Sequence, residues 1–537
     1  MDCLNITMKE NDSFIKEYTN HNADILQFFT YDPNKTESYK KRMAYRNNGR
    51  EQAVAAVVRE YMSDLALTQS QLDNITALSE GAKVVVGGQQ AGLFTGPLYT
   101  FHKILSILTK ADELSSEYNE RVVPIFWIAG EDHDFDEVDH TYVMNQRSGQ
   151  LNKVKYHTMT PPETTVSRYT PDREALHHAL VQFFESMPET VHSKRLFDQV
   201  DNMIQQSTTW LDVFKQMIQL CFGERGILLI DAQDTQLRSI EKPLFKDIIQ
   251  RHASVDQAFR DVQRKTTEAG LTAMIQTDTN VHLFLHEDDQ RQLLTYADGV
   301  FKLSKSENTY SMEALIALLD ESPERFSNNV VTRPLMQEWL FNTVAFVGGP
   351  SEIKYWAELQ GVFELFDVQM PIVLPRMRMT YLTSSTEKLL KKYDLTLEEV
   401  METGTQPARE RFIRANASEV VLAQIEAMQD QHQAFYETLT QEMSDTEDNK
   451  NLVKKNQEIQ MYQLDFLKSR YLNNIARENE ISMRHFEVLT QTLHPMGGLQ
   501  ERVWNPLQIL NENGLDVYAS TTFPPLHYTF DQIIIKL

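Results

Sequence analysis

The chain has 537 residues, enough to bury the cores of several domains, with 52 lysine and arginine residues against 76 aspartate and glutamate residues. The net charge of −24 argues against nucleic acid or an anionic membrane as a partner, because both attract basic faces. Two cysteines, Cys3 and Cys221, are too few for a disulfide framework or a cysteine zinc cluster. Only 19 residues are glycine, which favours a helix-rich globular protein and makes any cluster of glycines informative.

The N-terminal region has the pattern of helices, and no signal peptide is expected from its residues. Residues 1–80 are expected to be helical, because apolar side chains between 48 and 67 recur with a period near 3.6 residues. No basic start precedes an apolar block, and no apolar run reaches the length of about 18 residues that a membrane helix needs. These features predict a cytoplasmic protein.

Four short apolar runs have the composition of buried strands. They occupy residues 83–86, 122–129, 226–230 and 371–375. A helical pattern lies between the first two, and the order strand, helix, strand is typical of a parallel sheet covered by helices. The sequence therefore predicts an α/β fold with all four strands in one sheet.

Two polar stretches are predicted to be insertions into a core that spans residues 1–380. The first lies near 145–205. The second lies near 254–320 and includes a strand-like run at 281–285 and a hairpin-like segment at 296–303.

Residues 381–490 are predicted to form an α-helical antiparallel coiled-coil domain. One helix has a heptad seam at Val421, Ile425, Met428, His432, Phe435, Leu439 and Glu442. The second helix, at about 452–477, is expected to have Leu452, Ile459, Tyr462, Phe466 and Ile475 on its inner face. A long, partly exposed seam indicates a homodimer, and a helical pair packed on the globular body is the alternative. Residues 491–537 are expected to return to the core through a strand at 532–536.

Four glycines follow the first predicted strand within ten residues and precede a helix. Such a loop lets a ligand approach the backbone, and the helix N-terminus favours an anion. The spacing matches neither G-x-G-x-x-G nor a P-loop, so the ligand stays unnamed, and a tight turn is the alternative. The candidate binding residues are Gly88, Gln89, Gln90, Gly92, Thr95 and Gly96, and His102 is a candidate catalytic group.

An acidic cluster follows the second predicted strand, at the end of a parallel strand where ligands usually bind. Its members suit general acid–base chemistry or a divalent cation, whereas the spacing gives little support to zinc. The candidate catalytic residues are Glu131, Asp132, His133 and Asp134, with Trp127 as a binding residue. The alternative is an acidic first helical turn.

Three further segments contribute candidate binding residues. Asn329 and Arg333 lie in a polar loop before a helix, Gly349 lies in a second Gly-Gly turn, and Arg376 and Arg378 follow the fourth strand. Arginine can bind a carboxylate or phosphate through two parallel hydrogen bonds. A capping loop with a surface arginine is the alternative for Arg333.

These motifs together resemble the BshC family, the cysteine-adding enzymes of bacillithiol biosynthesis. The segments that carry the resemblance are GGQQAGLFTGPLYTFHKI, IFWIAGEDHDFDEV, RFSNNVVTRPLMQEW, VGGPSEIKYWAEL, PIVLPRMR and LHPMGGLQERVWNPL. The resemblance covers essentially the whole chain. It implies a Rossmann-like core and a coiled-coil arm that supports a homodimer.

The resemblance also implies an activity, the ligation of L-cysteine to the amine of glucosaminyl-malate to give the low-molecular-weight thiol bacillithiol. An amide needs an activated carboxyl, so ATP or ADP, with magnesium, is expected, and no residue is assigned to nucleotide or metal. The glycine loop would bind malate or phosphate, and the acidic cluster would bind amines and supply a base. His102 would stabilise charge or transfer a proton, while Arg333, Arg376 and Arg378 would neutralise carboxylates.

Two other classes of function stay open from the residues alone. One is a metal-dependent hydrolase or lyase that acts on a small sugar-acid. The other is a non-enzymatic coiled-coil scaffold with a degenerate nucleotide fold.

Overall fold

The computed structural model describes residues 1–46, 49–131, 134–145, 148–158, 164–288 and 290–537, and it divides the chain into two compact units. The first unit comprises residues 1–143, 152–382 and 501–537. The second comprises residues 144–151 and 383–500. The end of the chain therefore belongs to the same unit as its beginning.

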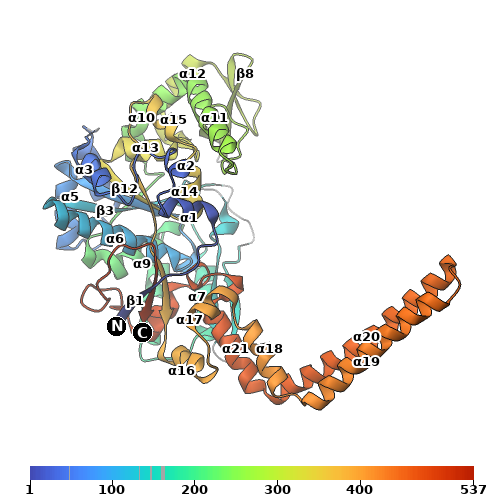
Figure 1. The fold of residues 1–537 in the computed structure, drawn as a ribbon. Helices are drawn as coiled ribbons and strands as arrows, with labels where there is room; N and C mark the ends of the chain where they lie inside the picture. The colour runs from blue at the N-terminus through green and yellow to red at the C-terminus, as the bar shows by residue number, and fades with distance from the viewer. Residues whose placement is uncertain (47–48, 132–133, 146–147, 159–163, 289) are drawn as a thin grey trace. The chain divides into compact units, whose positions relative to one another are not determined.

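A five-stranded parallel sheet forms the centre of the first unit (Figure 1). Its order is β13 (Ile372–Pro375), β12 (Thr343–Gly348), β2 (Lys83–Gln89), β3 (Val122–Ile128) and β6 (Leu228–Asp231). All four predicted strands are confirmed in this one sheet, and β12 is a fifth that the sequence analysis missed. The order of the strands across the sheet is that of a Rossmann fold. From β2 the chain first adds β3 and β6 on one side and then β12 and β13 on the other, so the strand order reverses between β2 and β12.

Helices pack against this sheet because its strands are apolar on both faces. Helix α6 (Tyr99–Tyr118) contacts β2, β3 and β12, and β3 is buried along its whole length. The other helices of this unit before the second insertion are α1 (Ser13–Thr19), α2 (Ala23–Leu26), α3 (Thr36–Ala44), α4 (Glu51–Tyr61), α5 (Gln69–Ser79), α7 (Arg173–Ser186), α8 (Ser193–Gln206), α9 (Trp210–Phe222) and α10 (Thr235–Gln250). Those after it are α13 (Arg333–Leu340), α14 (Pro350–Trp356), α15 (Gln360–Leu365) and α22 (Pro506–Asn513).

The second predicted insertion contributes four strands to an antiparallel sheet flanked by α11 (His252–Glu268) and α12 (Met312–Glu321), and β11, beyond the predicted bounds, is its fifth strand. Its strand order is β10 (Thr309–Tyr310), β9 (Val300–Leu303), β8 (Gln290–Ala297), β7 (Leu283–Glu287) and β11 (Phe326–Asn328). The predicted hairpin is confirmed, since Ala297 pairs with Val300 across a two-residue turn. In the first insertion, β4 (His140–Asn145) pairs with β5 (Gln150–Lys155), and α7 and α8 follow.

A small third sheet joins the two ends of the chain. Strand β15 (Gln532–Lys536) pairs antiparallel with β1 (Asp2–Ile6) and parallel with β14 (Arg378–Leu382). Figure 1 accordingly shows the N- and C-termini close together. The predicted terminal strand is confirmed, whereas the all-helical prediction for residues 1–80 is wrong at β1, which is exposed and gains its order from β15.

The second unit is helical. The helices α16 (Ser384–Lys392), α17 (Leu397–Thr403), α18 (Gln406–Ala415) and α21 (Glu480–Leu493) gather near the base of a long hairpin, which α19 (Glu419–Glu442) and α20 (Glu447–Glu478) form (Figure 1). The two long helices pack against each other, so the predicted antiparallel coiled coil is confirmed. Among the described helices of the whole chain, none combines the length and the apolar character that crossing a membrane requires.

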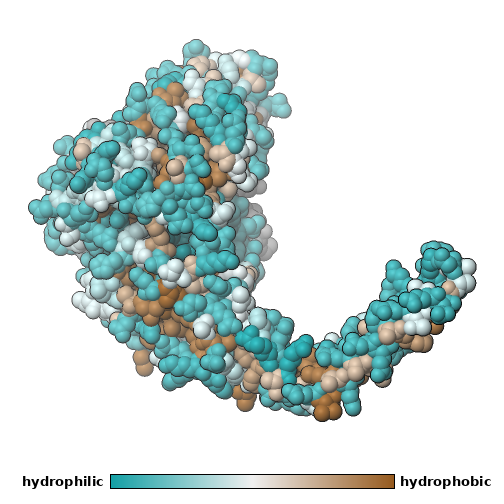
Figure 2. All heavy atoms as spheres, viewed as in Figure 1, coloured by the Kyte–Doolittle hydropathy of each residue, from teal (hydrophilic) through white to brown (hydrophobic). Residues whose placement is uncertain are grey.

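The hairpin buries fewer apolar side chains than its heptads predict. The buried ones are Ile425, Tyr436, Val453, Ile475 and Ala476, and Tyr436, Val453 and Ala476 were not predicted. An exposed apolar stripe remains along the hairpin, visible as brown spheres in Figure 2. Its members are Val421, Met428, Phe435, Leu452, Ile459, Tyr462, Phe466 and Leu467. The expected inner face of the second helix is therefore wrong except at Ile475.

Candidate active site

A cleft of about 570 Å³ opens at the carboxyl ends of β2 and β3, next to the point where the strand order reverses. One wall comes from the Rossmann-like core, and the other comes from the second insertion. The residues that line it are Gly88, Gln89, Gln90, Ala129, Glu131, Gln276, Thr277, Phe284, Arg291, Leu293, Asn328, Asn329, Val330, Arg333, Glu352 and Tyr355.

An ion pair between buried Lys103 and partly exposed Glu352 holds the base of this cleft. Lys103 on α6 donates to Glu352 Oε2 on α14 at 2.6 Å, to Gly88 O at 2.5 Å and to Gln89 Oε1 at 3.1 Å. Gly349 N donates to the same Glu352 oxygen at 2.7 Å. Burial alone would raise the pKa of Glu352, but Lys103 holds it below its usual value, so the carboxylate is ionised.

Arg333 supplies a cation at the cleft. It begins α13, and the Asn329 side chain organises that start by accepting from Val331 N at 2.9 Å and Thr332 N at 3.3 Å. The Arg333 guanidinium donates to the Tyr355 hydroxyl, and Glu352 and Glu131 also lie close enough to favour its charge. Burial raises the pKa of Tyr355 to about 12, so this phenol stays protonated at neutral pH.

Glu131 supplies a second carboxylate, directly after β3. A Cβ atom on the preceding Gly130 would lie 2.0 Å from Ser167 Oγ and 2.4 Å from Asp231 Oδ1, so only glycine fits there. The Glu131 carboxylate is largely buried and accepts from Arg238 Nη2 at 2.7 Å. The cleft thus presents two carboxylates and a guanidinium within one small space.

The structure brings six of the predicted residues together in the cleft lining: Gly88, Gln89, Gln90, Glu131, Asn329 and Arg333. Asp132 and His133 lie outside the described residues. Asp134 is exposed and does not line the cleft. Trp127 is buried within β3 and also lies outside the lining.

The second half of the glycine loop, Gly92, Thr95 and Gly96, lies outside the cleft lining. Asn505 holds this turn by donating to Phe94 O at 3.0 Å and Gly96 O at 2.9 Å. Phe94, Thr95 and Gly96 all have positive φ, which explains the glycine at the last position. This second half of the loop therefore forms an internal turn.

His102 and Arg376 converge on Glu501 instead of on the cleft. His102 Nδ1 lies 2.8 Å from Glu501 Oε2, and Arg376 donates to the other oxygen of that carboxylate. All three side chains are buried. Burial lowers the pKa of His102, and the imidazole is neutral.

The two remaining predicted residues also lie outside the lining. Gly349 caps α14 through its bond to Glu352. Arg378 pairs with Glu10 at 2.8 Å in the small terminal sheet. Gly349 therefore belongs to the framework around the cleft, and Arg378 belongs to the terminal sheet.

Sequence reasoning missed the cleft residues Glu352 and Tyr355 and the wall from the second insertion. Glu352 and Tyr355 were visible only as part of a motif whose aromatic residues favour a core position. The wall residues Gln276, Thr277, Phe284, Arg291 and Leu293 carry no local signal, because only the tertiary fold brings them to the sheet edge.

Three backbone N–H groups of the first glycine loop and of the residues before α6 donate within the chain. Leu93 N donates to Val138 O, Gly96 N to Leu93 O and Leu98 N to Trp504 O. Within the described ranges, no group of three or more His, Cys, Asp or Glu side chains is arranged to hold a metal ion. No chemical step is therefore assigned to a nucleotide or metal at these residues.

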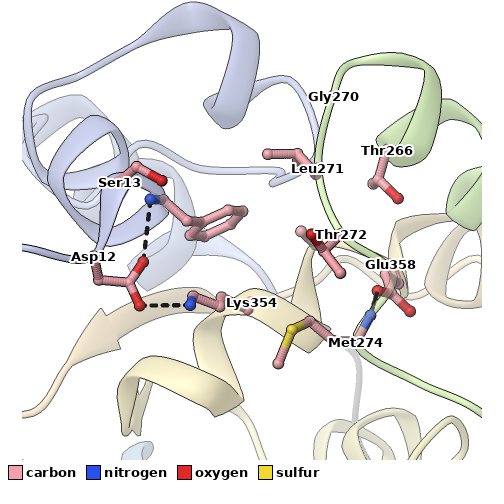
Figure 3. Close-up of a pocket in the computed structure, with 11 residues that line it drawn as sticks. Asp12, Ser13, Thr266, Gly270, Leu271, Thr272, Met274, Lys354 and Glu358 are labelled. Carbon is pink, nitrogen blue, oxygen red and sulfur yellow. Dashed lines mark hydrogen bonds and ion pairs between the residues drawn. The ribbon is translucent and has the colours of Figure 1, made fainter. Parts of the chain in front are cut away.

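A smaller hollow of about 150 Å³ lies between α1, α14 and the segment that follows α11 (Figure 3). Its charged side chains already have partners. Lys354 pairs with Asp12 at 2.5 Å, and Glu358 accepts from Met274 N at 2.5 Å and from Ile275 N at 3.2 Å. The larger cleft is therefore the stronger candidate for the active site.

The sheet order, the cleft at its reversal point and the helical hairpin define a Rossmann-like protein with a coiled-coil domain. The chain matches the family model "Bacillithiol biosynthesis BshC, N-terminal Rossmann-like domain" over residues 1–377 and "Bacillithiol biosynthesis BshC, C-terminal coiled-coil domain" over residues 379–537. It therefore belongs to the BshC family, as its motifs predict.

Full-length relatives agree with this assignment. Proteins of Staphylococcus haemolyticus, Staphylococcus carnosus and Staphylococcus aureus strain Newman are 58%, 55% and 55% identical to the chain over 536 residues. Each comparison covers 100% of both chains. These relatives carry the name "Putative cysteine ligase BshC".

The buried Glu501 cluster gives a prediction about stability. Burial would raise the pKa of Glu501, but Arg376 and His102 bring it down to about 2. Replacing Glu501 by Gln leaves Arg376 without its counter-charge and should cost about 3 kcal/mol at pH 7. Differential scanning calorimetry should show the loss as a lower melting temperature.

The pH dependence follows from the depressed pKa. Glu501 contributes its full stability above the unfolded value of about 4.3, and that contribution is lost as the pH falls toward 2. The gap between wild type and Glu501→Gln should stay constant from pH 8 to pH 5 and shrink below about pH 4. Glu10→Gln, which breaks the more exposed pair with Arg378, is the control and should cost less than about 1 kcal/mol. An equal loss in both variants would contradict the prediction.

Proposed function

We propose that this protein ligates the carboxyl group of L-cysteine to the amine of glucosaminyl-malate and so forms bacillithiol. Membership of the BshC family and the name of its relatives support the reaction class. The observation that carries the proposal is the meeting of Glu131, Glu352 and Arg333 in one cleft at the reversal point of the sheet. Carboxylates attract the amines of both substrates, and a guanidinium attracts their carboxylates.

The chain's own residues would act through position and charge. Arg333 would bind a substrate carboxylate, with its guanidinium oriented by Tyr355. Glu131 would take the proton that leaves the attacking amine as the new C–N bond forms. Glu352 would stay ionised beside Lys103 and hold the cleft floor in place. The insertion wall, with Phe284 and Leu293, would exclude water.

Amide formation needs an activated carboxyl, and we propose ATP as the energy source, with magnesium as its counter-ion. The described residues assign no site to either. Purified protein should convert cysteine, glucosaminyl-malate and ATP to bacillithiol, detected by mass spectrometry. Release of AMP would indicate an adenylate, and release of ADP would indicate an acyl phosphate.

A different result would favour the alternative class. Turnover of glucosaminyl-malate without nucleotide, abolished by a chelator, would point to a metal-dependent hydrolase or lyase. No turnover under any of these conditions would contradict the proposed ligation.

Substitutions in the cleft test the proposed roles. Glu131→Gln and Arg333→Ala should each lower kcat/KM for ligation at least about 100-fold, because an acid–base group or a carboxylate clamp is lost. Arg264→Ala removes a surface arginine that pairs with Asp261 at 2.9 Å and should leave kcat/KM unchanged. Ligation rates near wild type in either cleft variant would remove that residue from the proposed mechanism.

We also propose that the protein is a cytoplasmic homodimer that pairs through the stripe on α19 and α20. Phe435 and Phe466 are 56% and 49% exposed, and large apolar patches of this kind usually mark an interface. The unpaired thiols of Cys3 and Cys221 fit a reducing compartment.

The dimer can be tested by light scattering coupled to gel filtration. Wild type should have twice the chain mass of 62.3 kDa, and a Phe435→Glu/Phe466→Glu double variant should have the mass of one chain. Val191, which is 92% exposed in the first unit, gives the matched control Val191→Glu, and this variant should stay dimeric. A monomeric wild type would refute the dimer.

A further inference from the structure

A completely buried arginine lies directly behind the carboxylate of Glu131. Arg238 is on α10, the helix that follows β6, and its side chain has no exposed surface. It donates to Glu131 Oε2 at 2.7 Å and to Glu241 Oε2 at 2.5 Å. Glu131 lines the cleft, whereas Arg238 and Glu241 do not.

Stability alone gives a weak reason for such a cluster. Removing an arginine and a glutamate from water costs several kcal/mol for each ion, and apolar side chains of similar size often replace buried ion pairs without loss. What apolar side chains cannot do is fix the direction of a third charged group. The contact to Glu131 is therefore the feature of this cluster that calls for a functional explanation.

Glu241 braces the guanidinium from the same helix. It lies three residues after Arg238, so one turn of α10 fixes both side chains relative to each other. The Phe245 ring lies 5.6 Å from the guanidinium carbon and limits its movement on another side. Burial raises the pKa of Glu241 to about 7, so this carboxyl can take a proton while the charge of Arg238 stays with Glu131.

The backbone at Glu131 is constrained as well. Ser167 Oγ and Asp231 Oδ1 fill the space beside Gly130, and Ser167 N donates to Gly130 O at 3.0 Å. With the backbone fixed in this way, the remaining freedom of Glu131 lies in its side chain. Arg238 removes that freedom by holding one carboxylate oxygen.

We propose that Arg238 is a positioning residue for Glu131, and that Glu241 sets the direction of the Arg238 guanidinium. Held in this way, the Glu131 carboxylate faces the cleft in one orientation, in place to receive the amine proton. This inference rests on the proposed function, in which Glu131 acts on the attacking amine.

The test is a double-mutant cycle in the ligation assay, with the full-length protein. Arg238→Lys should lower kcat at least 10-fold and change the KM for glucosaminyl-malate less than 3-fold, because a compact ammonium group cannot hold both carboxylates. Adding Arg238→Lys to Glu131→Gln should lower kcat no further, since both changes remove one interaction. A further 10-fold loss in the double variant would overturn the proposal.

Two variants of Glu241 separate positioning from simple loss of fold. Glu241→Gln keeps an acceptor for Arg238 and should keep kcat within about 3-fold of wild type, whereas Glu241→Ala should lose as much kcat as Arg238→Lys. Equal rates for both variants would overturn the role of Glu241. If Arg238→Lys does not fold, these two variants still decide the question.

The Arg42–Glu338 pair provides a matched control. It is equally buried, burial also raises the pKa of Glu338 to about 7, and Arg42 donates to Thr343 O at the opposite, amino-terminal end of β12. Glu338→Ala should lower the melting temperature as much as Glu241→Ala and leave kcat unchanged. If Glu241→Ala and Glu338→Ala both lower kcat in proportion to their loss of melting temperature, the proposal is overturned. Failure of wild type itself to form bacillithiol would instead refute the proposed function.

Discussion

The ion pair between Lys103 and Glu352 is the interaction on which the candidate active site depends. Lys103 is on the helix after β2 and Glu352 is on the helix after β12, so the pair spans the point where the strand order reverses. At such a point the connections that leave the two neighbouring strands run to opposite sides, and a crevice opens between them at the carboxyl ends of the strands. This pair fixes the floor of that crevice, because Lys103 is buried behind it and Glu352 lines the cleft.

The positive charge that the cleft offers to a ligand depends on which nearby cations are already paired within the protein. The chain has a net charge of −24, so an anionic substrate must bind against the overall field, using local cations. Of those cations, Lys103 donates three bonds within the protein, and Arg238 is shared between two glutamates. Arg333 lines the cleft, donates to a neutral phenol and has Glu352 and Glu131 nearby. A substrate carboxylate would complete its pairing.

The sequence predicted those parts of the fold that depend on local composition. Apolar, β-branched runs identified four of the five central strands, and the heptads identified the two long helices. Strand β12 was missed because its end, Gly348, together with Gly349, has the pattern of a turn. The glycines at the end of β2 also have a structural reason: a Cβ on Gly87 would lie 2.6 Å from Val347 O, and one on Gly88 would lie 2.5 Å from Trp127 O. These glycines let neighbouring strands approach, a requirement that one strand's sequence cannot reveal.

The candidate site was only partly predictable for the same physical reason. Residues at strand ends, such as Glu131 and Gln89, could be placed because parallel strands end at one edge. The partner of His102 is 399 residues away, in the segment that returns to the core, and nothing near His102 distinguishes a buried structural imidazole from a catalytic one. The same segment supplies Trp504, whose carbonyl accepts from Leu98 N at the start of α6. At the start of a helix that has the pattern of an anion site in the sequence, the chain itself thus accepts one of the backbone N–H groups.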